Sequence, residues 1–464
     1  MCGVIGVSGV ADAARIAYLG LYALQHRGQE SAGIVAVDSV GRAKLHRAMG
    51  LVSDAFSESS LRELTGDIAV GHTRYSTAGS TVLANAQPYL VNYHAGPLSL
   101  AHNGNLTNAT ALREQLVRDG AIFATTVDGE VLVHLIARSR AATIDGQVRD
   151  ALEHVDGAYS LVLSVGRTIY AAVDSRGFRP MVIGRLGGGL VVASETCALD
   201  LMGAKLVREL KPGDFVRIDD GELIDLPRLT PRRVSRCIFE LVYFSRPDST
   251  VFGESVNHVR RELGRQLARF HPAPGADVVF SVPDSSNAMA LGYSEESGIK
   301  LDHGLIRNHY VGRTFINPVQ ALRVEKVKIK FNPVRDVIAG RSVVVIDDSL
   351  VRGTTSKGLV GMIRDAGAAE VHLRLASPPI TGPCHYGIAT PTREELIAST
   401  HTVEEIRQYL GVDTLEYLTL DEMMDAAGRR NEWCHACFSG DYPTPVQLTL
   451  GQLRQPSPPV TVPA

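Results

Sequence analysis

The stretch that decides the fold of the second half of the chain is Val343-Val344-Val345-Ile346-Asp347-Asp348-Ser349-Leu350-Val351-Arg352-Gly353-Thr354-Thr355-Ser356. Its continuous apolar run predicts a buried strand, and the two acids and the Gly/Thr-rich turn that follow predict the start of a helix. Strands that are apolar on both faces are typical of parallel sheets covered by helices. Ligands of such sheets bind beyond the carboxyl ends of the strands, so this turn is expected to form a binding site.

The residue types in this turn favour a ligand that carries ribose and phosphate. Backbone N–H groups and hydroxyls of Arg352–Thr355 can bind a phosphate at a helix N-terminus. The carboxylates of Asp347 and Asp348 can accept hydrogen bonds from ribose hydroxyls and can hold Mg²⁺. An acidic helix cap would explain one Asp, but not two Asp followed by Arg-Gly-Thr-Thr. The chain contains no Gly-x₄-Gly-Lys-Ser/Thr motif, which excludes a P-loop nucleotide site.

The residues before this stretch follow the same strand–turn–helix order. Apolar runs predict strands over residues 276–282 and 341–346, and a charged amphipathic pattern predicts a helix over 257–270. Such alternation is typical of βαβ units, so an α/β domain with a parallel sheet is expected. The loop after the first strand, Val282-Pro283-Asp284-Ser285-Ser286, is the second place where a ligand is expected.

The first half of the chain is richer in strands. Short apolar runs separated by Gly and Asp predict strands over 160–165, 168–173 and 189–193, while helical patterns are clearest over 109–119 and 130–142. An α+β layered domain is therefore expected. Leu210–Pro231 is typical of a closing hairpin followed by a proline-rich connector, which predicts a domain boundary near Pro231–Ser235. The Pro-rich tail after Tyr442 is expected to be extended.

Composition narrows the class of protein. A length of 464 residues with 45% hydrophobic and 21% charged residues is typical of a globular protein of two or three domains. A net charge of −3 argues against a general nucleic-acid binder. The N-terminus does not resemble a secretory signal, and no apolar run reaches the ~18 residues that span a membrane. We therefore expect a cytoplasmic protein without nucleic-acid or membrane partners, in which disulfides are unfavoured.

Cys2 has a position that suits nucleophilic catalysis. Removal of Met1 would leave Cys2 with a free α-amine, whose reference pKa of about 7.7–8.0 lets it act as a general base near neutral pH. A terminal nucleophile with its own amine as base is a known activation scheme. Taken alone, this position is a weak signal, and an ordinary cysteine is the more common explanation.

Further segments of the first half are dense in Gly, Asn, His and Arg, which is untypical of core packing. Together with Met1-Cys2-Gly3-Val4-Ile5-Gly6, they resemble the glutaminase domain of class II glutamine amidotransferases, the N-terminal-nucleophile type. This resemblance implies a four-layer αββα fold. The segments are His26-Arg27-Gly28-Gln29-Glu30-Ser31-Ala32-Gly33, Gly71-His72-Thr73-Arg74-Tyr75-Ser76-Thr77, His102-Asn103-Gly104-Asn105-Leu106 and Asp128-Gly129-Glu130.

The resemblance implies a role for each glutaminase residue. Cys2 is the nucleophile, and the Asn103 side chain and the Gly104 backbone N–H form the oxyanion hole. Arg74 binds the α-carboxylate of glutamine, and Asp128 binds its α-ammonium group. In isolation, Arg74 could form a surface ion pair, Asn103-Gly104 could form a tight turn, and Asp128 could be a helix N-cap. The neighbours of Asp128 depart from the Ser-Asp-Ser/Thr-Glu usual in near relatives, although the Asp is kept.

The second half resembles the type I phosphoribosyltransferases, which bind 5-phosphoribosyl 1-pyrophosphate (PRPP). The resemblance assigns the ribose-phosphate motif to Asp347–Thr355, the loop facing pyrophosphate to Asp284 and a Mg²⁺ contact to Ser285. Tyr310-Val311-Gly312-Arg313-Thr314 resembles the flap that closes over PRPP, with Arg313 as a contact. Arg323 and Lys330 are available to the pyrophosphate charge, or are merely solvated.

Four of the remaining cysteines form a candidate metal set. Cys434-His435-Ala436-Cys437 is a C-x₂-C motif that Cys237 and Cys384 would complete, and four thiolates suit either Zn²⁺ or a [4Fe–4S] cluster. The spacing of the cysteines does not distinguish a Zn²⁺ site from a [4Fe–4S] cluster. The contexts Cys237-Ile238-Phe239-Glu240 and Pro378–Cys384 resemble a family branch that carries a [4Fe–4S] cluster. Cys197 is left as a packed free thiol.

The combination of glutaminase segments and PRPP motif, which extends from Met1 to about Pro445, resembles the amidophosphoribosyltransferase family. This implies a glutaminase domain over 2–232, a phosphoribosyltransferase domain with the cluster cysteines over 233–445 and a flexible tail over 446–464. The implied reaction transfers ammonia from glutamine to PRPP, the first committed step of purine synthesis, through a closed passage that keeps ammonia unprotonated. It also implies a homotetramer and inhibition by purine nucleotides. Another class II amidotransferase and a non-catalytic PRPP sensor remain alternatives.

Overall fold

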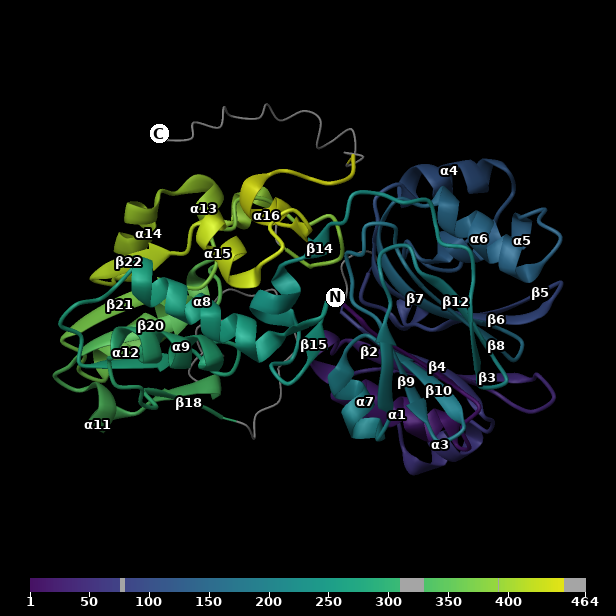
Figure 1. The fold of residues 1–464 in the computed structure, drawn as a ribbon, viewed down its shortest axis with the longest axis horizontal. Helices are drawn as coiled ribbons and strands as arrows, with labels where there is room; N and C mark the ends of the chain where they lie inside the picture. Colours follow the sequence, from purple (N-terminus) through teal and green to yellow (C-terminus); the bar gives the residue numbers. More distant parts are fainter. Residues whose placement is uncertain (76–79, 309–328, 391, 446–464) are drawn as a thin grey trace.

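The computed structural model describes residues 1–75, 80–308, 329–390 and 392–445. The chain forms two lobes that lie side by side, a strand-rich lobe from the N-terminal half and a lobe around a parallel sheet from the C-terminal half (Figure 1). Among these residues no helix is long and apolar enough to cross a membrane.

The N-terminal lobe contains two stacked sheets. One has the strand order β11 (Lys205–Glu209), β9 (Val182–Leu186), β10 (Gly189–Ala193), β1 (Gly3–Ser8), β4 (Ile68–Arg74), β2 (Ser31–Val37) and β3 (Ala43–Met49). The other has the order β13 (Glu222–Asp225), β12 (Phe215–Asp219), β8 (Thr168–Val173), β7 (Gly157–Val165), β6 (Gly96–Leu106) and β5 (Tyr89–Tyr93). Val4 of the first sheet and Val162 of the second share one buried cluster, so the sheets pack face to face.

Helices cover the outer face of each sheet. Buried residues of α1 (Ala13–Ala23) and α7 (Thr196–Met202) pack on the first sheet. Those of α4 (Ala109–Arg118), α5 (Glu130–Arg138) and α6 (Ile144–His154) pack on the second. The result is the expected αββα four-layer arrangement.

Local differences from the sequence prediction have clear physical causes. The helix predicted over 130–142 ends at Arg138, because Ser139 is extended and its hydroxyl donates to Asp150 at 2.7 Å. Helix α1 was not predicted: its small buried residues, among them Ala13, Ala14 and Ala17, give an indistinct apolar face. The predicted hairpin after Leu210 is confirmed as the antiparallel pair β12–β13.

The C-terminal lobe is built on the parallel sheet β17 (Val278–Ser281), β20 (Ser342–Asp347), β21 (Glu370–Leu375) and β22 (Thr414–Tyr417). Helices α8 (Val256–Phe270), α9 (Asn287–Ser297) and α15 (Leu420–Ala427) share a core with Val279 and Val344. Helices α12 (Thr354–Asp365) and α14 (Val403–Leu410) share a core with the alternate residues Val278 and Val343. Both faces are therefore covered, as the apolar strands predict.

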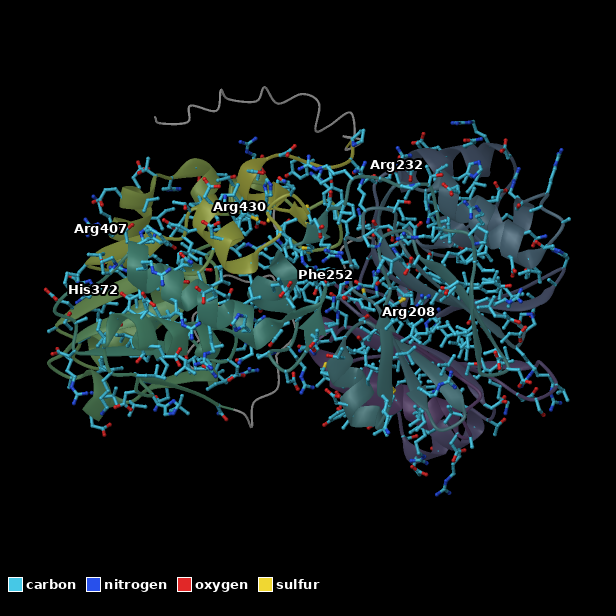
Figure 2. All side chains as sticks on the ribbon, viewed as in Figure 1. Arg208, Arg232, Phe252, His372, Arg407 and Arg430 are labelled. Carbon is cyan, nitrogen blue, oxygen red and sulfur yellow. The ribbon has the colours of Figure 1, made fainter. Side chains whose placement is uncertain are left out.

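Specific contacts connect the start and the end of the second lobe, and one contact connects the second lobe to the first. Strand β14 (Arg236–Cys237), at the start of the second lobe, pairs in parallel with β23 (Trp433–Cys434) near its end. Phe252, labelled between the lobes in Figure 2, packs edge to face on Trp433 with a centroid distance of 5.9 Å. Across the junction, Phe178 stacks on Tyr386 at 4.4 Å. Charged side chains at the periphery instead pair locally, as Arg407 does with Glu404.

Candidate functional site

The first candidate site surrounds Cys2. Cys2 precedes β1, and the antiparallel register of Gly3 with Thr73 brings it beside the end of β4. The Cys2 backbone N–H donates to Oδ1 of Asn103 on β6 at 3.0 Å, and its Sγ lies 3.7 Å from the carbonyl oxygen of Tyr75. The Cys2 residue is only 8% exposed. The fold thus brings together residues that are a hundred positions apart.

Asn103 presents an unsatisfied donor next to Cys2. Its side chain is fully buried, and its orientation is fixed because Oδ1 accepts from Cys2. Within the described part of the chain, its Nδ2 group has no hydrogen-bond partner. A buried N–H without a partner is costly and marks a position where an acceptor can bind. Gly104 follows with φ +151°, and a Cβ there would lie 2.0 Å from the Ala158 carbonyl oxygen, so no larger residue fits.

Arg74 and Asp128 lie at the ends of neighbouring elements of this lobe. Arg74 ends β4, is 2% exposed and donates to the Ser80 carbonyl at 3.1 Å. Asp128 does not cap α5, whose N-cap is Gly129 without a side-chain cap bond. Its Oδ2 instead accepts from the backbone N–H of Leu106 at 2.8 Å, which holds the carboxylate beside the end of β6. Ser76 and Thr77 of the quoted motif lie outside the described residues.

Sequence reasoning missed two residues at this site. The guanidinium of Arg27 is fully buried, and its Nε donates to the Cys2 carbonyl at 3.0 Å. Met1 is 1% exposed and lies against Arg179, and burial lowers the pKa of its α-amine to about 5. His26-Arg27-Gly28 had stood out by composition, but the partner of Arg27 could not be identified from spacing.

The second candidate site lies at the carboxyl edge of the parallel sheet. Asp347 ends β20, and Asp348 follows it. The loop after β17 approaches both acids: Ser285 Oγ donates to Asp348 at 2.5 Å, and Ser286 Oγ donates to Asp347 at 3.3 Å. The two loops that the sequence indicated therefore meet.

Two buried carboxylates at one edge leave an excess of negative charge. Burial, and then the Asp348 charge, raises the pKa of Asp347 well above its usual range. Burial also raises the pKa of Asp348, although hydrogen bonds from Ser285 and Ser349 and the charge of Arg260 oppose the shift. A divalent cation at this edge would offset the repulsion, and carboxylate and hydroxyl oxygens are the ligands that Mg²⁺ prefers.

The Gly/Thr turn opens helix α12 as the sequence predicts. Gly353 has φ +76° and is the N-cap, without a side-chain cap bond, and Thr354 and Thr355 form the first helical positions. Arg352 pairs with Glu395 at 3.0 Å. Asp284 pairs with Arg307, a partner that the sequence did not indicate. Arg352, Gly353, Thr354 and Thr355 line a cavity of about 440 Å³.

The cavity extends from the second site to Tyr75, the neighbour of Cys2. Its lining includes the phosphate turn, with Asp347 and Thr354, and also Tyr75, whose carbonyl faces the Cys2 thiol. Three aromatic residues, Phe239, Tyr243 and Phe244, also line it. The predicted flap Tyr310–Thr314, with Arg313, and also Arg323 lie outside the described residues. Lys330 is described, and its carbonyl accepts from the Asn308 N–H at 2.8 Å.

The four predicted cluster cysteines gather at the lobe junction. Cys237 and Cys434 are register partners in the β14–β23 pair, and Cys437 follows in α16 (Ala436–Ser439). Cys384 Sγ accepts from the Tyr386 N–H at 3.3 Å. Burial raises the pKa of Cys437 well above its usual range, and the nearby Cys384, Cys237 and Cys434 raise it further.

The cysteine set has two further properties. All six cysteines of the chain are free thiols. Over the described ranges, no group of three or more His, Cys, Asp or Glu side chains has the arrangement of a metal site. Cys197 is buried apart from the other thiols in α7, and burial raises its pKa to about 12, as befits a packed thiol.

Comparison with known proteins gives matches over nearly the whole chain. A family model described as a glutamine amidotransferase domain matches residues 72–201. The amidophosphoribosyltransferase of Bacillus subtilis is 48% identical over 452 residues, which cover 96% of this chain and 94% of that protein. Amidophosphoribosyltransferase 2 of Arabidopsis thaliana, a chloroplastic protein, is 49% identical over 447 residues, with coverages of 95% and 79%.

A solved structure agrees with the sequence matches. Glutamine PRPP amidotransferase from Bacillus subtilis, complexed with ADP and GMP, superposes with a TM-score of 0.90 at 46% identity, and the match covers 98% of this chain and 100% of that one. Fold and site together define a class II glutamine amidotransferase joined to a phosphoribosyltransferase. The chain belongs to the amidophosphoribosyltransferase family.

Proposed function

We propose that this enzyme transfers ammonia from glutamine to PRPP, giving 5-phosphoribosylamine, glutamate and pyrophosphate, the first committed step of purine synthesis. The observation that carries the proposal is one cavity whose lining includes both the ribose-phosphate turn and Tyr75, whose carbonyl oxygen lies 3.7 Å from the Cys2 thiol. Ammonia released at Cys2 can reach the ribose carbon without mixing with bulk water, where it would be protonated.

Cys2 is proposed as the nucleophile that attacks the glutamine amide. Removal of Met1 would free the Cys2 α-amine, which already lies 3.0 Å from Asn103 Oδ1 and would take the thiol proton. The unpartnered Nδ2 of Asn103 and the backbone N–H of Gly104 are proposed to bind the developing oxyanion. Arg74 and Asp128 are assigned to the α-carboxylate and the α-ammonium group, because they offer opposite charges at the edges of the site.

The PRPP residues are proposed to act by position and charge. The turn Arg352–Thr355 binds the 5-phosphate at the N-terminus of α12, and Asp347 and Asp348 bind the ribose hydroxyls. Asp284, in the loop that faces pyrophosphate, and Arg313, in the flap, are assigned as further PRPP contacts. Asp347, Asp348 and Ser285 would hold Mg²⁺, which when bound would supply positive charge that stabilises pyrophosphate as a leaving group. The donor set fits this ion, because the paired carboxylates otherwise repel each other.

Cys237, Cys384, Cys434 and Cys437 are proposed to hold a [4Fe–4S] cluster with a structural role. Their thiols lie close enough to influence one another's pKa, which supports the binding of one metal centre by all four. Four thiolates also suit Zn²⁺. Iron and acid-labile sulfide in equal amounts, with a brown colour, would establish the cluster, and zinc without iron would refute it.

Further assignments follow from the family. The glutaminase domain is proposed to span residues 2–232 and the phosphoribosyltransferase domain 233–445, a division that falls between β13 and β14. Residues 446–464 form the tail. Purine nucleotides are proposed as inhibitors, since the Bacillus subtilis relative is complexed with ADP and GMP. A homotetramer working in the cytoplasm stays a prediction.

The function is tested by incubating the enzyme with glutamine, PRPP and Mg²⁺ while measuring glutamate and pyrophosphate. We expect equal release of both products. The Cys2→Ala variant should lose glutamine-dependent activity but keep the ammonia-dependent reaction. Glutamate release without pyrophosphate would indicate a different amidotransferase, and PRPP binding without either product would indicate a sensor.

A further inference from the structure

Strand β6, which carries Asn103 and Gly104, is longer than the strand that pairs with one of its edges. The register with β5 ends at Leu100, which faces Tyr89, whereas β7 pairs with the other edge of β6 as far as Leu106. Beyond Leu100, the β5 edge of β6 has no paired strand among the described residues. Backbone groups of residues two apart face the same edge of a strand, so alternate residues of β6 need other partners there.

Two buried side chains take the place of the missing strand at His102, the residue before Asn103. The His102 N–H donates to Oε1 of Gln87 at 2.8 Å, and Nε2 of His72 donates to the His102 carbonyl oxygen at 3.0 Å. His72 is fully buried, and Gln87 is 4% exposed. An unpaired backbone group is costly in such surroundings, so these two bonds fix the backbone of β6 at this point.

The fold explains why His72 reaches the second sheet. His72 on β4 is the register partner of Val4 on β1, and Val4 packs between the two sheets. Directly opposed residues of an antiparallel pair point to the same face, so the His72 side chain points from the first sheet toward β6. Burial lowers the pKa of its imidazole to about 3. The ring is therefore neutral near neutral pH and keeps its proton on the nitrogen that faces the carbonyl.

Gln87 is also held by the first sheet. The carbonyl of its neighbour Ala86 accepts from Nη1 of Arg47, on β3, at 2.7 Å. A Cβ on Gly33, on β2, would collide with the Gln87 carbonyl oxygen, so the segment packs directly on that strand. Both supports of β6 thus come from the first sheet, in which β1 directly follows Cys2. They fix the sheet that carries the oxyanion donors relative to the sheet that carries the nucleophile.

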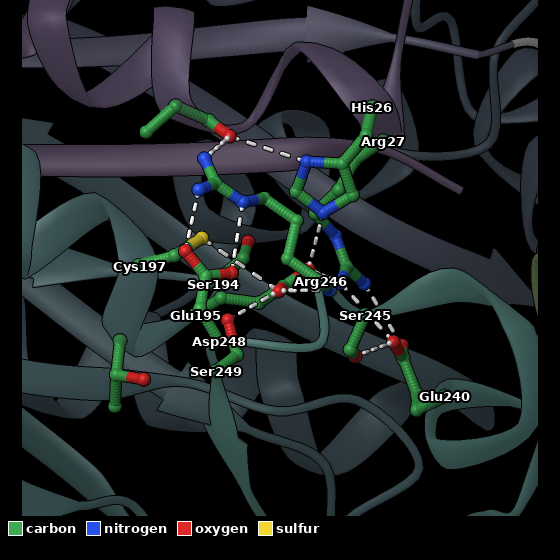
Figure 3. Close-up of polar contacts among 12 residues, drawn as sticks. His26, Arg27, Ser194, Glu195, Cys197, Glu240, Ser245, Arg246, Asp248 and Ser249 are labelled. Atoms are coloured by element: carbon green, nitrogen blue, oxygen red, sulfur yellow. Dashed lines mark hydrogen bonds and ion pairs between the residues drawn. The ribbon is translucent and has the colours of Figure 1, made fainter. Parts of the chain in front are cut away.

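The nucleophile itself is held by different residues. Arg27 donates through Nε to the Cys2 carbonyl oxygen at 3.0 Å. The guanidinium of Arg27 is fixed in turn by the buried carboxylates of Glu195 and Glu240 (Figure 3). None of these contacts involves the two supports of β6. A change in those supports therefore displaces the oxyanion donors while Arg27 still holds the nucleophile.

We propose that His72 and Gln87 are positioning residues for the oxyanion hole. The inference rests on the proposed function of the site around Cys2. By holding both backbone groups of His102, the two side chains set the direction in which the next residues of β6 present their donors. Such donors must lie within about 0.5 Å of the productive position, so a small displacement of β6 lowers the rate of the glutaminase step.

The test compares His72→Leu with His72→Gln in the full-length enzyme. Leucine removes the donor to the His102 carbonyl oxygen, whereas the amide of glutamine retains an N–H that can donate to it. The main readout is kcat and KM for glutamine hydrolysis in the presence of PRPP and Mg²⁺. The rate at which iodoacetamide alkylates Cys2, followed by mass spectrometry, reports on the thiol without involving the oxyanion hole. Ammonia-dependent synthesis and thermal unfolding are measured in parallel.

We expect His72→Leu to lower kcat by about 10-fold or more, a part of the about 10²–10³-fold lost with a whole oxyanion donor. KM and the alkylation rate should stay within about 2-fold, because the loss concerns the transition state and not the binding of glutamine. His72→Gln should restore kcat to within about 3-fold of the unaltered enzyme. An equal fall of kcat in both variants, or a parallel fall in the alkylation rate, would overturn the proposal.

Gln87→Met tests the other support and keeps the proposal falsifiable if His72→Leu does not fold. It removes the acceptor of the His102 N–H with little change in volume, and it should lower kcat while KM is kept. The matched control is Ser99→Ala, which removes a buried hydrogen bond of 2.7 Å to Ser164 from the same strand. This control should leave kcat unchanged at a similar loss of unfolding temperature. An equal fall of kcat in the control would overturn the proposal, because it would show that β6 is merely destabilised.

A double variant tests whether His72 acts through the oxyanion donors. In an Asn103→Ala background, one of the donors that His72 positions is absent. His72→Leu should therefore lower kcat less in this background than in the unaltered enzyme, and a full, additive loss would refute the path through β6. An unaltered enzyme that does not hydrolyse glutamine would refute the proposed function instead of the role of His72.

Discussion

The glutamine site and the PRPP site differ in the kind of group that each one requires from a ligand. Beside Cys2, the Nδ2 group of Asn103 has no hydrogen-bond partner among the described residues and requires an acceptor. At the sheet edge, Asp347 and Asp348 place two negative charges together, which requires a cation. The first site therefore suits an oxyanion that forms during the reaction, and the second suits a magnesium-bound anion. The unpaired donor at the first site and the two adjacent carboxylates at the second site indicate the kind of ligand better than the shape of either site does.

The largest effect is expected from the donor at the glutamine site. Asn103→Ala removes the unpartnered N–H and the acceptor for Cys2, and loss of one oxyanion donor costs about 10²–10³ in rate in other enzymes. We expect glutamine-dependent synthesis to fall by this factor while ammonia-dependent synthesis is kept, measured as pyrophosphate release with each nitrogen source.

The matched control for that change is Ser99→Ala on the same strand, which removes the buried hydrogen bond to Ser164 without touching Cys2. It should lower the unfolding temperature but not the ratio of the two activities. An equal fall with both nitrogen sources in Asn103→Ala would show that the two sites are not chemically separate.

The next effect concerns the cation at the PRPP site. Asp348→Asn removes a carboxylate that contacts Ser285 and is proposed to hold Mg²⁺. We expect synthesis to fall by about 10²-fold, equivalent to roughly 2.7 kcal/mol, with both glutamine and ammonia. The control is Asp277→Asn, which should keep activity. Asp277 accepts a hydrogen bond from the N–H of Ser342, at the end of β20 opposite to Asp347. A loss confined to glutamine would contradict the assignment of Asp348.

The fold and the local motifs were predictable because they depend on neighbouring residues. Short apolar runs identified β7, β8, β10, β17 and β20, and hence the α+β and α/β classes of the two lobes, whereas the four-layer order was implied by the family resemblance. Cys2, Asn103, Asp347 and the phosphate turn were identified because their chemistry lies within short segments. The end of α5 was wrong because it depends on Ser139 contacting Asp150, which is not a periodic signal.

The contacts between the lobes could not be predicted in the same way. Arg27 and Glu240 are 213 positions apart, and nothing in the sequence around either residue indicates the other. Within the second lobe, Asp284 in the loop after β17 pairs with Arg307 of β18 (Leu305–Arg307), and neither local sequence indicates the other residue. Buried ion pairs are set by tertiary packing, whereas a sequence motif records only the chemistry of one loop.

A smaller effect should arise where the second lobe supports the oxyanion strand. Gly387 has φ +103°, and a Cβ there would lie 2.8 Å from the backbone of Gly104. Gly387→Ala should therefore shift the strand that carries Asn103 and lower glutamine-dependent synthesis by roughly 10-fold, or about 1.4 kcal/mol. Gly361→Ala, on α12 with open space around it, is the control. Equal rates in both variants would show that the contact does not affect the site.

The smallest effect tests the charge imbalance itself. The pKa of Asp347 is raised in the folded state, so the folded protein binds more protons than the unfolded chain, and this residue makes stability fall as the pH rises through the interval between the two pKa values. Without divalent cations, Asp347→Asn should raise Tm by roughly 2–4 °C at neutral pH, where the parent carries the repulsion, and by less near the unfolded-state pKa. Addition of Mg²⁺ to the parent should reduce the difference between the two proteins, because the cation offsets the same repulsion. Calorimetry at two pH values measures the effect. A destabilised variant at neutral pH would show that Asp348 and its partners already compensate the second charge.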